Sequence, residues 1–196
     1  MKKGVWILVI LAALAALVFT YFKSSYNGMV AKSEQVSAQW ANVEAQYQRR
    51  ADLIPNLVNT VKGYASHESQ TLTEVIDARA KATQMNLQFD QINDQTLTRF
   101  QQAQSELSSA LNRLMAISES YPDLKANQNF LDLQTQLEGT ENRIATERRR
   151  FNESVQDYNV YIKSFPRNII AGMFDFTAKS MFAADPGAAA APEVRF

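Results

Sequence analysis

A long apolar run opens the chain. Residues 4–22 contain no charged side chain, and a helix of about 20 such residues is long enough to cross a hydrocarbon core of roughly 30 Å. The pattern predicts a transmembrane helix over residues 5–22, preceded by a flank of residues 1–4. Trp6 at one end, and Tyr21 and Phe22 at the other, are the candidate interfacial residues, because aromatic side chains gather at both membrane surfaces.

A cleavable signal peptide is the alternative interpretation of this segment. Ala13-Leu14-Ala15 has the small-x-small form of a cleavage site. The apolar core of a signal peptide is about 7–15 residues long, whereas here apolar residues continue as far as Phe19. An uncleaved anchor is therefore favoured.

Apolar residues at heptad spacing follow the span. From residue 26 to residue 47 they recur in steps of three and four, which is typical of a helix packed along one seam. The seam consists of Tyr26, Met29, Val36, Trp40, Val43 and Tyr47, with Ser33 at the missing step. This spacing predicts a near-continuous helix from the bilayer to about Arg50.

Breaks in the helical pattern are expected near residues 51–55, 85–95 and 121–123. At the first, either Asp52 caps a new helix that carries Pro55 in its first turn, or Pro55 kinks one long helix. The second break is a polar, irregular loop. The third precedes a proline, and the last long helix is then expected to run from near Asp123 to Pro166, because the residue before a proline avoids the helical region.

Amphipathic stripes between these breaks predict an all-α fold. The transmembrane helix is expected to continue into an elongated antiparallel bundle of three to four helices over residues 23–166. A solvated, elongated coiled coil is the alternative. Aromatic residues on the seams favour a filled bundle core, and these are Trp40, Tyr47, Phe100, Phe151 and Tyr158.

The chain changes character after Pro166. Residues 167–182 form an apolar, amphipathic segment that either folds back onto the bundle or contacts the membrane or a partner. Its candidate contact residues are Ile169, Ile170, Met173, Phe174, Phe176, Met181 and Phe182. Residues 183–196 are of low complexity and are predicted to form a disordered tail. Val194 and Phe196 give this tail the C-terminal pattern that PDZ-type grooves accept.

Composition and charge argue against catalysis. Lys plus Arg equals Asp plus Glu at 20 each, so no broad basic face for nucleic acid is expected. The chain has no cysteine and one histidine, His67, and it contains none of the common nucleotide-binding or hydrolase motifs. We therefore expect no enzyme activity, no cofactor and no metal site.

The positions of His67 and of the arginine clusters favour structural roles. Gln70 and Thr71 occupy the helical steps at which a second metal ligand would be needed, so His67 is expected to be solvated. Arg49, Arg50 and the run 148–150 are expected to pair with Glu and Asp on neighbouring helices rather than to bind anionic headgroups or phosphate. Those acids include Glu44, Glu147 and Glu153.

Several blocks of the sequence resemble the bacterial LemA family. They are the N-terminal span, YNGMV (26–30), the stretch VSAQWANVEAQYQRRADLIPNLVNTVKGYASHE (36–68), RRRFNESVQDYNVYIKSFP (148–166) and the terminal phenylalanine. The resemblance covers essentially the whole chain. It implies a single-span membrane protein with a long antiparallel helical bundle, no established enzymatic activity and, in some relatives, roles in membrane organisation that include internal-membrane formation in magnetosome-bearing bacteria.

Two indications of topology disagree. Lys2 and Lys3 precede the span, and Lys23 and Lys32 follow it. The clustering at the N-terminal side favours a cytoplasmic N-terminus in a bacterial inner membrane, with the bundle periplasmic or extracytoplasmic. The family resemblance implies a short N-terminus outside the cell, which places the bundle in the cytoplasm.

Two functional hypotheses follow from the sequence. The first is a structural scaffold that self-associates through its helices as a homo-oligomer and organises or remodels the bilayer. The second is a membrane-tethered adaptor that binds a signalling or proteolytic partner through the bundle or the C-terminal VRF tail.

Overall fold

The fold is an up-and-down arrangement of long helices. The computed structural model describes residues 2–85 and 87–183, with side chains from residue 4 onward, and these residues contain no strand. The long helices are α1 (Lys2–Tyr64), α2 (Ser69–Gln84), α3 (Asp94–Ile117) and α5 (Gln128–Lys163). Short elements join them or follow them: η1 (Phe89–Gln91), η2 (Ser118–Ser120), α4 (Pro122–Lys125) and α6 (Arg167–Met173).

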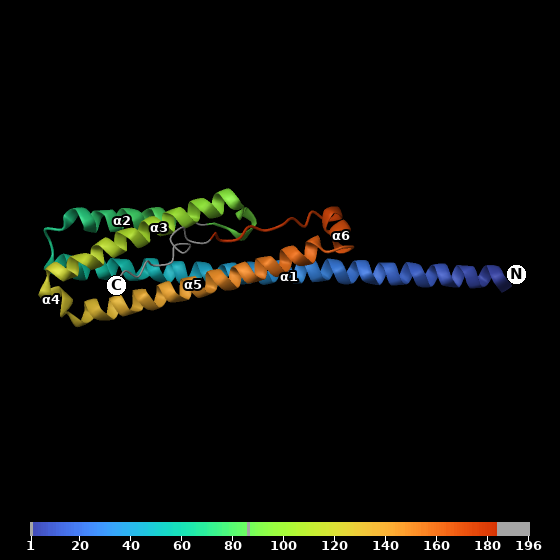
Figure 1. Cartoon of the computed structure of the whole chain (residues 1–196), viewed down its shortest axis with the longest axis horizontal. Coiled ribbons are helices and arrows are strands. Elements are labelled where there is room, and N and C mark those ends of the chain that lie inside the picture. The colour runs from blue at the N-terminus through green and yellow to red at the C-terminus, as the bar shows by residue number, and fades with distance from the viewer. Residues whose placement is uncertain (1, 86, 184–196) are drawn as a thin grey trace, which may run out of the picture.

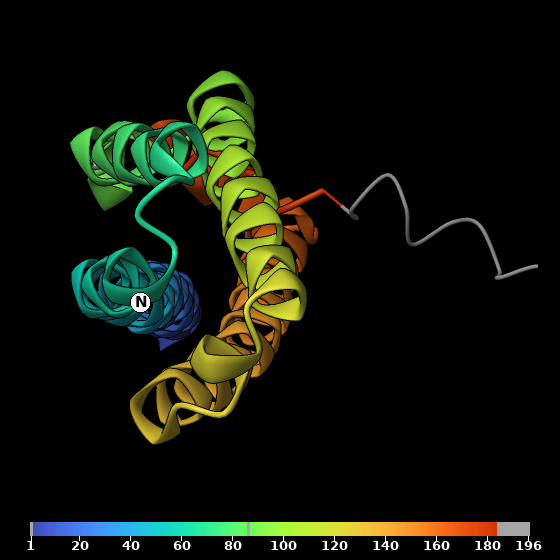
Figure 2. The same cartoon turned by 90° about the vertical axis from the view of Figure 1, so that its left-hand side faces the viewer.

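The four long helices alternate in direction along one axis (Figure 1). α1 packs mainly against α5, and α2 mainly against α3. The end-on view in Figure 2 shows the four helices arranged around a common interior, while the first part of α1 projects beyond the bundle. The expected all-α bundle that continues from the N-terminal helix is confirmed.

Local signals in the sequence explain where the later helices begin. Asn93 Oδ1 accepts hydrogen bonds from the backbone N–H groups of Gln95 and Thr96, and Thr96 Oγ1 accepts one from the Asn93 N–H, which is a complete capping box at the start of α3. Asn127 Oδ1 accepts from the Phe130 N–H at the start of α5. The last long helix therefore begins at Gln128 rather than near Asp123, because the short helix α4 comes first.

Of the two alternatives for residues 51–55, the new helix capped by Asp52 is wrong, and the chain continues there as one long helix. α1 is one helix of 63 residues, about 95 Å long at 1.5 Å per residue, and Pro55 lies inside it. Pro55 has no N–H to donate to the carbonyl of Ala51. Arg79 of α2 replaces that donor, because its Nε donates to the Ala51 oxygen at 2.8 Å. The first break instead falls at residues 65–68, between α1 and α2.

Arg79→Ala is expected to destabilise the protein by about 1–3 kcal/mol, because it leaves the carbonyl of buried Ala51 without a donor. The effect should shrink in a Pro55→Ala background, where residue 55 regains an N–H for the same carbonyl. Chemical unfolding of the four chains in detergent micelles, followed by circular dichroism, measures this coupling. Equal losses in both backgrounds would show that Arg79 does not replace the missing donor.

The interior consists of two apolar clusters separated by a polar layer. The cluster nearer the span includes Trp40, Phe100 and Phe151, and the far cluster includes Leu57 and Leu114. Arg50, only 1% exposed, lies between them. Its guanidinium donates to Glu141 Oε1 at 2.5 Å, to Ser108 Oγ at 2.8 Å and to Gln104 Oε1, so that the layer joins α1, α3 and α5.

Candidate membrane-contact site

The projecting part of α1 is apolar and unpacked. Its large side chains from Val5 to Phe19 are more than half exposed, with Trp6 at 68%. Within the described part of the chain, α1 alone is long and apolar enough to cross a membrane, and none of its most apolar window is buried. Tyr21 is exposed and Phe22 is half-buried where the span meets the bundle. Both lie at the end where an interfacial belt is expected.

α6 packs beside this end of the span. Figure 1 shows α6 folded back next to α1 at the boundary between the projecting segment and the bundle. An apolar groove of about 350 Å³ lies between them, lined by Leu17, Val18, Tyr21 and Phe22 of α1 and by Pro166, Ile169 and Ile170. α6 thereby lies beside the end of the span, at the level at which α1 would leave a bilayer.

The apolar segment 167–182 divides into a packed part and an exposed part. Ile170 and Phe182 are buried in the bundle interior and Phe176 packs against it, so these three side chains belong to the core and not to an open contact surface. The exposed members are Ile169, Met173, Phe174 and Met181, between 45% and 63% exposed. α6 ends at Met173, so Phe174, Phe176, Met181 and Phe182 lie beyond this helix.

Phe165, between α5 and α6, is a further contact candidate outside the predicted segment 167–182, because its side chain is 81% exposed. Together with Ile169 and Met173 of α6, it gives this region three large exposed apolar side chains, of which Phe165 precedes the helix. Exposed apolar side chains beside a span are suited to shallow insertion at the boundary between headgroups and acyl chains.

Residues 174–183, here called the strap, leave α6 and run back along α5. The Phe176 N–H donates to the Ala171 carbonyl and Asp175 adopts a left-handed φ of 57°, which is the geometry of a Schellman helix end.

Two asparagines of α5 hold the strap along this helix. Asn159 forms hydrogen bonds with both backbone groups of Lys179, and Asn152 with both backbone groups of Phe182. Asn152 and Asn159 are seven residues apart on a helix, and Lys179 and Phe182 are three residues apart in extended chain. Both separations are about 10 Å, so the two asparagines match the spacing of the two strap residues.

The strap ends against an aromatic cluster. The Phe182 ring lies 5.9 Å from that of Trp40 and 5.4 Å from that of Phe151, centroid to centroid, and the Arg148 guanidinium lies over its face. No sequence pattern predicts the pairing of Asn152 and Asn159 with the strap, because asparagine on a helix is usually solvent-facing. Val194 and Phe196, and the predicted disordered tail from residue 184 onward, lie outside the described residues.

The arginine clusters are largely engaged within the protein. Arg149 pairs with Glu153 at 3.9 Å and Arg150 with Glu147 at 2.8 Å, which confirms ion pairing for these two. Arg50 pairs with Glu141 across helices rather than with an acid on its own helix. His67 is exposed in the turn after α1, and no three His, Cys, Asp or Glu side chains in the described ranges gather as a metal site.

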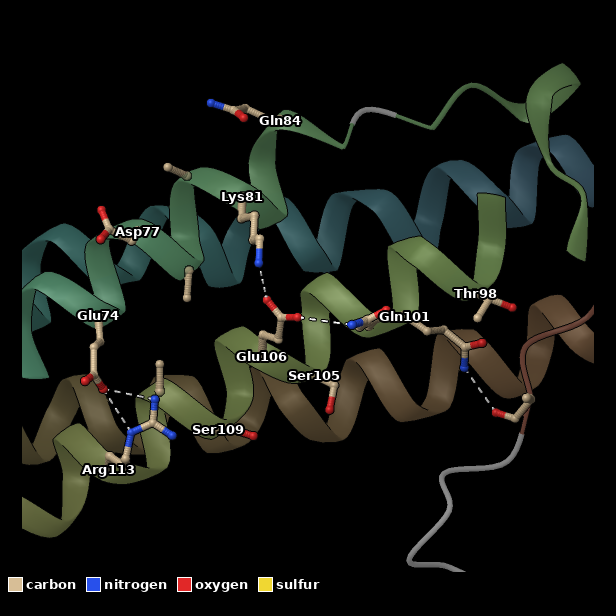
Figure 3. Close-up of a pocket in the computed structure, with 15 residues that line it drawn as sticks. Glu74, Asp77, Lys81, Gln84, Thr98, Gln101, Ser105, Glu106, Ser109 and Arg113 are labelled. Carbon is tan, nitrogen blue, oxygen red and sulfur yellow. Dashed lines mark hydrogen bonds and ion pairs between the residues drawn. The ribbon is translucent and has the colours of Figure 1, made fainter. Parts of the chain in front are cut away.

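A second candidate region is the open groove between α2 and α3, about 980 Å³ in volume (Figure 3). Lys81 Nζ lies 2.8 Å from Glu106 Oε2, and Arg113 Nη2 lies 3.1 Å from Glu74 Oε2. The hydrogen bond from Lys81 holds the pKa of Glu106 below its usual value. Each of these charges has a partner of opposite sign on the other helix, so the two ion pairs link α2 to α3.

Comparison with known proteins places the chain among LemA-family and magnetosome proteins. A model of the LemA family matches residues 39–196. The magnetosome proteins MamQ 1 and MamQ 2 of Paramagnetospirillum magneticum are each 30% identical over 179 residues, covering 82% of this chain and 65% of the relative. Protein LemA of Metamycoplasma hominis is 24% identical over 183 residues, covering 93% of this chain and 80% of the relative.

The chain spans about two thirds of the length of the magnetosome relatives, 65% in the alignments. The family match covers most of the bundle, α6 and the strap. Together with the apolar projecting helix, these relatives fit a membrane-associated protein. The chain belongs to the LemA family.

Proposed function

We propose that the protein is a membrane-anchored structural scaffold that self-associates through its helices and organises or remodels the bacterial membrane. The observation that carries the proposal is the packing of α6 beside Leu17–Phe22, with Phe165, Ile169 and Met173 left exposed at that level. An anchor alone needs no second apolar element. A second element at the same depth enlarges the area that the chain occupies in one leaflet, and interfacial helices of this kind respond to membrane curvature.

The rest of the molecule suits a structural role. The bundle, with its two apolar clusters and its cross-helix ion pairs, is a rigid rod attached to the end of the span. The relatives that carry the name magnetosome protein agree with the membrane-organising role that the family resemblance implies. We place the span in the bacterial inner membrane, with the bundle periplasmic on the charge count and cytoplasmic as the alternative.

Electron cryo-microscopy of vesicles containing the full chain tests the proposal. The unaltered protein should form ordered homo-assemblies and deform the vesicles into tubes or small spheres. Ile169→Asp with Met173→Asp should abolish most of this deformation while circular dichroism shows unchanged helix content, because charge opposes insertion of the α6 face.

The matched control is Ile76→Asp with Leu131→Asp, which alters two exposed apolar residues of α2 and α5 in the half of the bundle far from the span. It should leave the deformation intact. Discrete small oligomers on round vesicles, formed by the unaltered protein, would overturn the scaffold proposal and favour the membrane-tethered adaptor.

A further inference from the structure

Two cationic side chains share one tyrosine ring where α1, α5 and α6 meet. The Arg167 guanidinium carbon lies 4.1 Å from the ring centroid of Tyr161, and Lys32 Nζ lies 5.6 Å from the same centroid. The three side chains come from three different helices, so the fold and not local sequence brings them together. We call Lys32, Tyr161 and Arg167 the basic cluster.

Close backbone approach holds the ring of the basic cluster in place. A Cβ atom at Gly28 would lie 2.1 Å from Tyr161 Oη, so only glycine lets the tyrosine lie this close to α1. The ring is therefore fixed between α1 on one side and Arg167 at the start of α6 on the other. Because the Tyr161 ring is fixed, the Lys32 and Arg167 side chains that lie over it are held in defined positions.

The charges of the basic cluster have no ion-pair partner among the residues that the structure describes. Neither Lys32 nor Arg167 forms an ion pair with any residue in the described ranges. Arg167 Nε is buried and has no hydrogen-bond partner there. A cation–π contact offsets only part of the cost of an unsatisfied buried donor. The terminal donors of Arg167 and Lys32 also have no acceptor among the described residues, so the cluster offers an anion two positive charges and free donor groups.

The position of the basic cluster along the α1 axis, measured from the end of the span, indicates the source of that anion. Gly28 lies six residues beyond Phe22, about 9 Å along the helix axis. The headgroup layer of each leaflet is roughly 5–8 Å thick beyond the hydrocarbon core. Arg167 begins the helix whose Ile169 and Ile170 line the groove with Leu17–Phe22. If the span occupies residues 5–22, the backbone of the cluster thus lies just outside the headgroup layer, and the long side chains of Lys32 and Arg167 can reach lipid phosphates, since side chains on a helix such as α1 tilt toward its N-terminus.

We propose that Lys32, Tyr161 and Arg167 form a binding site for the phosphate of an anionic phospholipid headgroup. Arginine suits this role because its planar donors match phosphate oxygens in pairs, and lysine adds a second point charge. Exposed Lys23, directly after the span, adds to the positive potential at the same level. The inference rests on the membrane placement in the proposed function, and it adds that the contact selects lipids by charge.

Thermal unfolding of the full chain in a neutral detergent tests the site. Titration with phosphatidylglycerol should raise the unfolding midpoint saturably, because a ligand that binds only the folded state stabilises it. Phosphatidylcholine should act with at least tenfold lower apparent affinity, and millimolar inorganic phosphate should have no saturable effect. Lys32→Gln with Arg167→Gln should reduce the preference for phosphatidylglycerol at least tenfold.

The matched control removes the same charge elsewhere. Lys62→Gln with Arg143→Gln alters two exposed cations of α1 and α5 and should keep the preference intact. If the double variant of the cluster does not fold, Arg167→Lys keeps the charge but loses paired recognition, and it should show a weakened preference.

Three results would overturn the proposal: an unchanged preference in the cluster variants, an equal loss in the control, or an inorganic phosphate effect as strong as that of the lipid. The measurement is independent of membrane deformation. A selective lipid effect with undeformed vesicles would leave the site standing and remove the scaffold function.

Discussion

Trp40→Ala is expected to lower the free energy of unfolding by about 3–5 kcal/mol, the usual range for removing a large aromatic side chain from a core. Trp40 is 3% exposed, and its ring packs against those of Phe100, Phe151 and Phe182. Its Nε1 also donates to the Leu87 carbonyl at 3.0 Å. One side chain therefore holds together α1, α3, α5, the loop after α2 and the strap.

Trp40→Phe is the matched control. It keeps an aromatic ring in the cluster and removes the indole donor, so its cost should be clearly smaller than that of Trp40→Ala. Chemical denaturation of the full chain in detergent micelles compares the two. A loss below about 1 kcal/mol for Trp40→Ala would mean that the aromatic cluster is not a packed core.

Glu141→Gln is expected to destabilise the protein by about 2–3 kcal/mol. The substitution leaves the Arg50 charge in a side chain that is 2% exposed, with only neutral acceptors around it. Orphaning one member of a fully buried pair costs about 3–5 kcal/mol, and the 44% exposure of the Glu141 side chain reduces that cost through solvent screening.

Glu138→Gln provides the comparison, because Glu138 is an exposed carboxylate on the same helix whose partner is Gln134 on α5 itself. Its effect should stay within about 0.5 kcal/mol, as for most surface substitutions. Similar small losses for both variants, measured by the same denaturation, would show that Arg50 is stabilised by its neutral partners and not by Glu141.

The heptad seam of α1 could have predicted more than it did. Continued in steps of three and four beyond Tyr47, it reaches Arg50, Ile54, Leu57 and Val61, and all four are buried. The period therefore crosses Pro55 without a change of phase, which is the sequence signal for an unbroken helix. Pro55 by itself predicts a break, and the compensating donor comes from Arg79 of another helix, which the sequence of α1 does not show.

The polar layer around Arg50 could also have been predicted from the sequence. An arginine at a seam position predicts a buried charge that needs a partner from another helix. Which acid supplies that partner could not be predicted, because Glu141 is 91 residues from Arg50 and meets it only through the packing of α5 against α1. Ion pairs within one helix, such as Arg150 with Glu147, follow from sequence separation alone.

The candidate site was only partly predictable for the same reason. Composition identified residues 167–182 as unusually apolar, but it could not separate buried Ile170 and Phe182 from exposed Ile169 and Met173. That division depends on where α6 ends and on the pairing of the strap with Asn152 and Asn159. Both are contacts between segments, and no periodicity within residues 167–182 encodes them.

The central claim is that α6 and the end of the span enter the same face of a bilayer. Because the chain has no cysteine, single cysteines at Ile169, Met173, Leu17 and Ile76 can each carry a nitroxide label in the otherwise unaltered protein. In vesicles, labels at Ile169 and Met173 should collide more with oxygen than with a water-soluble nickel complex, as at Leu17, while the label at Ile76 should show the reverse. Labels at Ile169 and Met173 that behave like the one at Ile76 would contradict the account.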